Sequence, residues 1–424
     1  MKILLVNPPS VFLINEKVFP SLGLLYLSAY VKKNGYNDVS FIDMNDEKPL
    51  PSQIDADIVG LYSNTPQFPA VVKSVKEIRV MNKNKNASYI LGGPHVSGKP
   101  EDAFEDFDSV VIGEGERSLL DIIRRKESSH SFEKVIRHEY IRDIDDLPFP
   151  DREMIDIKSY KYFLDGQLTT TVISSRGCPF GCNFCANNAW GKSLRMRSPG
   201  NIYEEVRMLK ENYGYEAFMF FDDTMTVDRK RMSRICSLLK ELKIIYRCFI
   251  RSDTVDKEIL SSMRRSGCVE VGVGIESGSQ RILNIVNKGE TVKKNMEAVK
   301  MCRKLGIRTK GFFVVGLPGE NSESISETEE FLKEADMDDI DITVFSPYPG
   351  SLIYKEKSRF DIFFKDDYEH AWYKGRPGDY RTTVSTSELK SDKILRIRDE
   401  LEKKFKKRSK DNLGHGIYSH SGLQ

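Results

Sequence analysis

Short apolar runs alternate with amphipathic stretches along the first 125 residues of the chain. The apolar runs, at residues 3–6, 39–42, 58–62, 89–92 and 110–112, are almost continuously hydrophobic. That pattern is typical of parallel strands that are buried on both faces of a sheet. The stretches between them, for example 24–33 and 68–81, predict helices. A strand–helix series of this kind predicts a doubly wound, Rossmann-like α/β domain over residues 1–125.

The alternation pauses over residues 126–165 and then starts again. Residues 126–165 are polar and include the segment DDLPFPD at 145–151, which predicts a linker between domains. Over residues 166–350, apolar runs at 170–174, 217–221, 245–250, 269–275, 311–315 and 342–345 are separated by stretches with apolar residues at helical spacing. Six such units predict a partial (β/α)6 barrel with its site at the carboxyl ends of the strands.

The pattern decays after residue 350. We expect an α-rich carboxyl-terminal segment at 351–408, with one helix at 388–408 that combines an apolar stripe with a face rich in Lys and Arg. Residues 409–424 predict a disordered tail. Aromatic residues Trp372, Tyr373 and Tyr380 lie in the segment that follows the predicted barrel, where we expect chain that closes over a substrate.

Composition narrows the classes of protein. Of 424 residues, 39% are hydrophobic, which is enough for sizeable cores, and the 30% that are charged nearly balance at a net charge of +2. That balance argues against a protein that mainly coats nucleic acid. We expect no membrane span, because no apolar run is long enough to cross a bilayer. The first apolar run is too short for a secretory signal, so we expect a cytoplasmic protein.

The cysteines carry the candidate chemistry. The chain has seven, and residues 177–185 read GCPFGCNFC, which places Cys178, Cys182 and Cys185 on a loop just after a predicted strand. An odd number with three clustered does not suggest disulfides, whereas thiolates suit zinc or iron–sulfur clusters. A structural zinc site needs four ligands. Three thiolates therefore favour a 4Fe–4S cluster with one open iron over a zinc knuckle completed by a distant histidine.

This CxxxCxxC loop after a first barrel strand resembles the radical S-adenosylmethionine superfamily. Further matching motifs follow later strands: DDT at 222–224, GIES at 274–277, GLPGE at 316–320 and YPG at 348–350. The resemblance implies that the open iron binds the amino and carboxylate groups of S-adenosylmethionine. An electron, from a donor such as flavodoxin or ferredoxin, would then cleave this cofactor to methionine and a 5′-deoxyadenosyl radical.

The resemblance also implies residues that bind S-adenosylmethionine. Glu276 and Ser277 would contact the ribose or the ammonium group, and Arg251 would pair with the carboxylate as a bidentate fork. Asp222 would join them from the end of the second strand. Gly316 would let the adenine approach the backbone, and Phe184 would pack on the cluster or the adenine. The competing interpretation of Glu276 and Arg251 is a pair of surface ion pairs. We name no residue as catalytic.

The amino-terminal domain resembles the cobalamin-binding domain that precedes the radical barrel in one large subgroup. The matching segments NPP at 7–9, PSLGL at 20–24, DIVG at 57–60, GGPH at 92–95 and GEGE at 113–116 fall at predicted strand ends. The residues expected to bind cobalamin are Leu22, Gly23, Ser63, Thr65, Gly92, Gly93 and Gly113. The Asp-x-His-x-x-Gly motif that supplies an axial histidine in classical cobalamin enzymes is absent. We therefore expect no protein histidine on cobalt, with His95 packed in its loop or near the ligand.

Three functions remain open on the sequence. The first is a cobalamin-dependent radical methyltransferase acting on an unactivated carbon of a small-molecule, lipid or tetrapyrrole substrate, with radical cyclisation or oxidation on the same scaffold as its alternative. The second is a methylthiotransferase, which the lack of any cysteine before Cys178 disfavours. The third is a non-catalytic protein that senses redox state or carries electrons, which would leave the motifs at 276–277 and 316–320 without a purpose.

Overall fold

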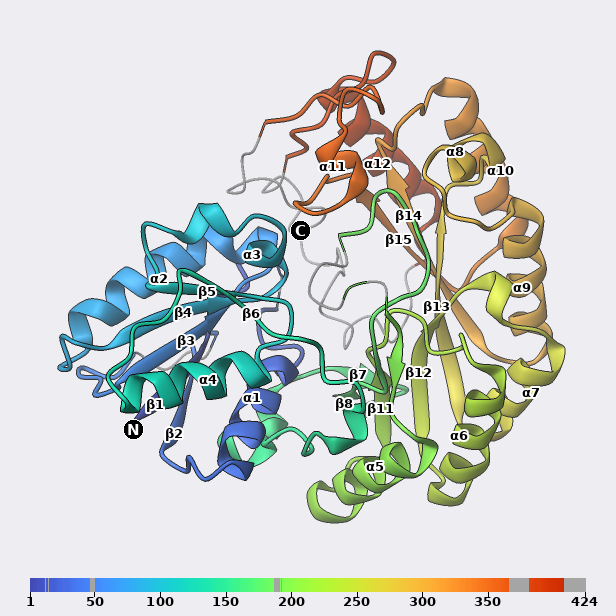
Figure 1. Ribbon diagram of the computed structural model, residues 1–424. Helices are drawn as coiled ribbons and strands as arrows, with labels where there is room; N and C mark the ends of the chain where they lie inside the picture. Colours follow the sequence, from blue (N-terminus) through green and yellow to red (C-terminus); the bar gives the residue numbers. More distant parts are fainter. Residues whose placement is uncertain are drawn as a thin grey trace.

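A computed structural model describes residues 1–11, 13, 15–45, 50–186, 191, 193–365 and 381–407 of the chain. Two α/β units lie side by side, the first coloured blue to teal and the second green to orange in Figure 1. The expectations for Trp372, Tyr373, Tyr380 and residues 409–424 lie outside the described residues. None of the helices in the described ranges is long and apolar enough to cross a membrane.

The first unit is a six-stranded parallel sheet with strand order β2-β1-β3-β4-β5-β6. Its strands are β1 (Ile3–Asn7), β2 (Val39–Asp43), β3 (Ile58–Tyr62), β4 (Ser88–Gly92), β5 (Ser109–Ile112) and β6 (Val135–Arg137). Its helices are α1 (Leu22–Lys33), α2 (Phe68–Met81), α3 (Pro94–Gly98) and α4 (Glu116–Glu127). The apolar faces of α1 and α4 pack on one side of the sheet, and that of α2 packs on the other. The predicted doubly wound sheet is confirmed.

The second unit is a curled sheet with strand order β15-β14-β13-β12-β11-β8-β7. Six strands are parallel: β8 (Gln167–Val172), β11 (Ala217–Phe220), β12 (Ile245–Ile250), β13 (Cys268–Glu276), β14 (Arg308–Val315) and β15 (Asp339–Val344). The helices α5 (Pro199–Tyr213), α6 (Arg229–Leu242), α7 (Lys257–Arg265), α9 (Val292–Lys304) and α10 (Ser322–Ala335) follow the outer face. The predicted partial (β/α)6 barrel is confirmed, strand for strand.

The segment 126–165 differs from the predicted linker, because much of it is built into the two sheets. β6 adds to the first sheet beside β5, and β7 (Phe163–Leu164) forms an antiparallel pair with β8 in the second. Between these strands, Ile141, Ile144 and Leu147 are buried against α1. The chain between the units is therefore packed against both of them.

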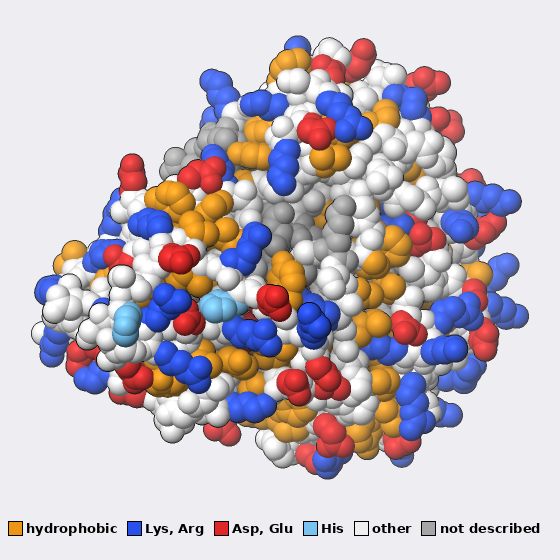
Figure 2. All heavy atoms as spheres, in the orientation of Figure 1, with side chains coloured by type: hydrophobic (Ala, Val, Ile, Leu, Met, Phe, Trp, Pro, Cys, Tyr) orange, Lys and Arg blue, Asp and Glu red, His pale blue; other side chains and the backbone are white. Residues whose placement is uncertain are grey.

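The carboxyl-terminal helix closes the end of the barrel sheet. α12 (Ser391–Phe405) packs against β14 and β15, and the guanidinium of Arg398 donates a 2.9 Å hydrogen bond to the carbonyl of Ile342. Two short helices, α8 (Gln280–Ile285) and α11 (Leu352–Lys355), lie near the same end of the barrel. The apolar stripe predicted over 388–408 thus docks on the barrel. On the face shown in Figure 2, described basic and acidic side chains are interspersed, in keeping with the balanced charge.

Candidate functional site

The cysteine loop lies between the two short paired strands β9 (Ser175–Arg176) and β10 (Arg195–Met196). Gly177 turns the chain with φ of +89°, and a Cβ there would lie 2.4 Å from the carbonyl oxygen of Ser193, so only glycine fits. The backbone amide of Asn183 donates a 2.9 Å bond to the carbonyl of Val286, which ties the loop to the chain after α8. The three cysteines therefore lie on an anchored loop at the carboxyl ends of the barrel strands.

Cationic side chains surround Cys182. The guanidinium of Arg251 lies 3.7 Å from the ring centre of Phe180, and one of its nitrogens is 3.9 Å from the sulfur of Cys182. Burial raises the pKa of the Cys182 thiol, whereas the charges of Lys288 and Arg251 act to lower it. Burial also raises the pKa of Cys178. Ligation of iron requires thiolates, so both cations favour the form of Cys182 that would bind a cluster.

The donor set of this loop fits an iron–sulfur cluster by its chemistry: three free cysteines on one anchored loop with cations beside them. Within the part of the chain that the structure describes, no three metal-binding side chains already converge on one point. The ligand assignment of Cys178, Cys182 and Cys185 thus remains a proposal that rests on spacing, anchoring and charge.

Glu276 ends β13 in the left-handed region, with φ of +65°. Its carboxylate is buried and lies 2.8 Å from the ammonium of Lys288, which is 3.4 Å from the carboxylate of Glu290. Burial lowers and the two carboxylates raise the pKa of Lys288, and the net shift is upward. The ion pair of Glu276 is therefore buried, unlike the surface pair of the competing interpretation. Sequence reasoning did not single out Lys288 or Glu290.

Arg251 does not present a free fork in the structure. Two of its nitrogens lie 3.0 and 2.9 Å from the carboxylate oxygens of Asp253, and one donates to the carbonyl of Lys288. Together with its stacking on Phe180, these contacts make Arg251 a residue that positions the cysteine loop. Its expected role as a partner of the cofactor carboxylate stays a prediction.

Asp222, Ser277 and Gly316 are engaged within the protein. The buried carboxylate of Asp222 accepts bonds from the backbone and hydroxyl of Ser174 and from Ser175, and burial raises its pKa. The hydroxyl of Ser277 lies 3.2 Å from that of Thr328, in the core. A Cβ on Gly316 would lie 3.1 Å from Ile394 of α12.

Asp222, Ser277 and Gly316 thus hold strand ends and α12 in place. These contacts account for their residue types without a bound cofactor. Phe184 is partly buried and packs against the main barrel core. Among the six residues expected to bind S-adenosylmethionine, Glu276 keeps the geometry that best suits direct contact.

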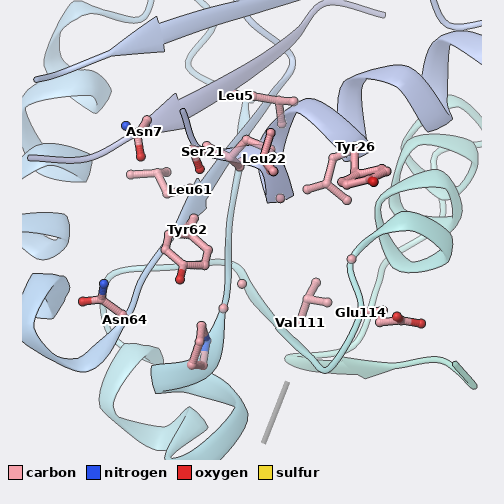
Figure 3. A pocket seen from close by; sticks show the side chains of 18 of the residues that line it. Leu5, Asn7, Ser21, Leu22, Tyr26, Leu61, Tyr62, Asn64, Val111 and Glu114 are labelled. Carbon is pink, nitrogen blue, oxygen red and sulfur yellow. The ribbon is translucent and has the colours of Figure 1, made fainter. Parts of the chain in front are cut away.

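A cavity of about 480 Å³ opens at the carboxyl ends of the first sheet and reaches the barrel. Figure 3 shows Leu22 and Tyr26 from α1 and Tyr62 from the end of β3 along its walls. Five of the seven residues expected to bind cobalamin line it: Leu22, Gly23, Gly92, Gly93 and Gly113. Gly93 has φ of +110°, and a Cβ there would lie 2.5 Å from the carbonyl oxygen of Ser63. The glycines bring bare backbone to the cavity, as a large flat ligand requires.

Ser63, Thr65 and His95 lie beneath the cavity wall. Ser63 is buried and its hydroxyl donates to the carbonyl of Asn64. His95 is fully buried, with its ring centre 4.1 Å from that of Phe68 and Nδ1 3.3 Å from the hydroxyl of Thr65. His95 therefore packs within the domain, and the two hydroxyl residues support the wall from behind.

The barrel contributes Arg176, Phe221 and Asp223 to the same cavity. Arg176 lies 2.8 Å from the carboxylate of Glu114 and 2.7 Å from that of Glu116, at the start of α4. Arg195 adds a second contact to Glu114, at 2.8 Å. All four side chains are buried, so they form an ion-pair cluster, the interdomain clamp, whose arginines lie on the two strands that flank the cysteine loop. Sequence reasoning noted the GEGE motif but not its partners.

Comparison with known proteins agrees with this architecture. Residues 172–332 match the radical SAM superfamily and residues 16–123 match the B12 binding domain. A protein of Pyrococcus horikoshii named as an uncharacterized methyltransferase is 32% identical over 385 residues, covering 84% of this chain and 83% of that protein.

A more distant relative is named for a different activity. The anaerobic magnesium-protoporphyrin IX monomethyl ester cyclase of Cereibacter sphaeroides is 27% identical over 379 residues, which cover 81% of this chain and 61% of the cyclase. Among solved structures, the radical S-adenosylmethionine methyltransferase TsrM of Kitasatospora setae, with cobalamin and a [4Fe-4S] cluster bound, superposes with a TM-score of 0.71. It is 16% identical, with 95% of this chain and 91% of that chain covered, so it supports the fold.

Proposed function

Since this chain belongs to the radical S-adenosylmethionine superfamily, in the branch that carries an amino-terminal B12-binding domain, we propose that it is a cobalamin-dependent methyltransferase acting on a small molecule. A relative that is 32% identical is itself named as an uncharacterized methyltransferase. A reductant, of the flavodoxin or ferredoxin class, supplies the electron, and we expect no nucleic acid partner.

One observation carries this proposal: a single cavity is bounded by both domains. Gly92, Gly93 and Gly113 border it from the sheet, and Arg176 borders it from the barrel, two residues before Cys178. A corrin held at the sheet would therefore face the loop that we expect to hold the cluster. When bound, the cluster, S-adenosylmethionine and cobalamin supply an electron, a carbon radical and a carried methyl group.

The residues of the chain have complementary tasks in this proposal. Cys178, Cys182 and Cys185 hold iron, while Arg251 orients their loop through Phe180 and Asp253. Glu276, fixed by Lys288, presents a carboxylate at the barrel mouth for the ribose or ammonium group of S-adenosylmethionine. Phe19 and Phe221, which line the cavity, help to keep water from the reactive centre.

Oxidative ring closure is the second candidate, because a relative 27% identical is named as a cyclase. The two reactions differ in their use of S-adenosylmethionine. Methyl transfer through cobalamin consumes one molecule as a methyl source, which leaves S-adenosylhomocysteine. Ring closure needs only the radical source and leaves 5′-deoxyadenosine alone.

The test is anaerobic reconstitution with iron, sulfide and hydroxocobalamin, followed by S-adenosylmethionine and a chemical reductant. We expect about one corrinoid per chain and formation of both S-adenosylhomocysteine and 5′-deoxyadenosine. Formation of 5′-deoxyadenosine without S-adenosylhomocysteine would favour ring closure. Failure to retain any corrinoid would overturn the methyltransferase proposal.

A further inference from the structure

Three phenylalanines point into the half-barrel, one directly after β11, one from β12 and one from β14. Their chain neighbours Phe220, Cys248 and Phe313 belong to the core between the sheet and the outer helices. Successive side chains of a strand point to opposite faces. Phe221, Phe249 and Phe312 therefore face the interior of the half-barrel.

These rings form one continuous surface with Phe19 of the amino-terminal unit. The ring centres of Phe19 and Phe221 are 5.4 Å apart, those of Phe221 and Phe249 are 6.0 Å apart, and those of Phe249 and Phe312 are 5.7 Å apart. Gly272 lies between the last two, where a Cβ would come within 2.7 Å of one ring and 2.8 Å of the other. We call Phe19, Phe221, Phe249 and Phe312 the aromatic wall.

The end of the aromatic wall formed by Phe19 and Phe221 is open to the cavity. Phe19 and Phe221 line the cavity, and Phe221 is 46% exposed. Large apolar side chains exposed in a concave site mark surface that a ligand covers. Gly92, Gly93 and Gly113 of the first unit line the same cavity.

The charges beneath the wall are paired with one another. Arg247 lies 3.0 Å from the carboxylate of Glu270 and also donates to the hydroxyl of Tyr162, which packs under Phe19. Lys310 lies 2.7 Å from the carboxylate of Asp339. The wall therefore offers ring faces and edges to a ligand, while the charges of the side chains beneath it are largely neutralised.

We propose that the aromatic wall binds the methyl acceptor and that this acceptor is a flat, uncharged aromatic or conjugated ring system. This inference rests on the proposed function, because an acceptor must lie between the methyl carrier and the radical source. Flat rings gain by stacking or edge contact with such a wall, beyond the area that they bury. Phosphorylated or sugar-like acceptors would find few partners there.

The experiment uses 1-pyrenemethanol, an uncharged four-ring probe, with protein already loaded with hydroxocobalamin. We expect saturable binding, with pyrene fluorescence quenched by the nearby corrin. Phe221→Ala and Phe249→Ala should each weaken binding about tenfold. Phe363→Ala, at a phenylalanine that is 60% exposed and lies outside the cavity lining, is the matched control and should bind as the unaltered protein does.

Corrinoid content and S-adenosylmethionine binding are measured on the same variants. Equal pyrene binding by both wall variants and the control would overturn the proposal, as would displacement of the probe by cytidine 5′-monophosphate at equal concentration. Loss of corrinoid from the wall variants would assign the wall to the corrin site, and competition by S-adenosylmethionine would assign it to the adenine. If protein that retains no corrinoid still binds pyrene, the proposed function fails while the inference about the aromatic wall stands.

Discussion

Glu276 holds a backbone conformation that glutamate rarely adopts. Its φ of +65° coincides with a shift in strand register between β13 and β14, and its carboxylate is fixed by Lys288. Residues persist in such conformations only when their surroundings over-determine them, and they cluster at binding sites. The strain at Glu276 thus supports a binding role.

Glu276→Gln should weaken S-adenosylmethionine binding about tenfold or more, because the charge-assisted hydrogen bond is lost. Iron content should stay unchanged, since Glu276 is not expected to bind the cluster. Equilibrium binding measured by filtration checks this, with Glu297→Gln on the exposed face of α9 as the control. Unaltered affinity would make Glu276 a purely structural residue.

Replacing any one of Cys178, Cys182 and Cys185 by Ala should remove most of the iron together with the visible charge-transfer absorption. A three-thiolate site has no spare ligand. Cys302→Ala, at a buried cysteine of α9, is the matched control and should keep both. A full complement of iron in any of the three loop variants would show the ligand assignment to be wrong.

Glu320 makes the protein less stable as pH rises. It is fully buried, accepts bonds from the amides of Gly316 and Leu317, and burial raises its pKa to about 8. A carboxyl whose pKa is raised in the folded state stays protonated while the unfolded chain ionises. Stability should therefore fall between pH 4.5 and about 8, by on the order of 1.4 kcal/mol for each pH unit from this group.

Glu320→Gln should flatten that decline, because the amide oxygen still accepts both bonds without ionising. Denaturant unfolding at several pH values measures the effect, and Glu330→Gln on the exposed face of α10 should leave the slope as it was. Identical slopes for Glu320→Gln and unaltered protein would contradict the raised pKa.

The sequence predicted the individual residues unevenly. Cys178, Cys182 and Cys185 stand out because their spacing is local. Lys288 and Glu290 escaped notice because their importance arises from contacts across loops, with Glu276 and with Arg251. Arg251 lies where the sequence placed it, yet Asp253, two residues away, occupies its fork.

At the scale of elements, the β9–β10 hairpin joins the two units. It carries Arg176 and Arg195, whose partners Glu114 and Glu116 lie at the start of α4. Because these charged side chains are buried, removing one of them would leave its partner buried without an opposite charge. The hairpin thus fixes the cysteine loop relative to the cavity.

Arg176→Gln should destabilise the protein by about 3–5 kcal/mol, since it leaves the carboxylate of Glu116 buried without its ion pair. Arg207→Gln removes exposed pairs with Glu204 and Glu211 and should cost at most about 1 kcal/mol. Urea unfolding of the two variants gives the comparison. Similar losses of stability would mean that the interdomain clamp contributes no more than a surface pair.

Strands were predictable where they were long and apolar. All six parallel barrel strands coincide with apolar runs, because both faces of such strands are buried. The sequence did not predict β6 and β7, because they have only three and two residues and lie within a polar segment. Their pairing is decided by the adjacent sheets and not by their own sequence.

At the scale of the whole molecule, the cavity determines how cobalamin would be held. His95 lies beneath the wall, packed on Phe68 and bonded to Thr65, so it is not placed to reach a metal in the cavity. The relative placement of the units could not be read from the sequence, because the contacts between them join residues 60 or more positions apart.

His95→Ala should lower the melting temperature, because it removes a buried ring, yet leave corrinoid content unchanged. The electron paramagnetic resonance spectrum of the Co(II) protein should also be the same before and after the substitution. Nitrogen superhyperfine splitting that disappears in the variant would establish His95 as an axial ligand.

The interdomain clamp has a thermodynamic consequence for the chain as a whole. If one unit unfolded alone, Arg176 or Glu114 in the other unit would stay buried without its partner of opposite charge. The two units should therefore unfold in one cooperative transition. Linkage then makes each ligand stabilise both units, whichever one it touches. A corrinoid bound to the first sheet would raise the unfolding temperature of a barrel that it contacts only at its rim.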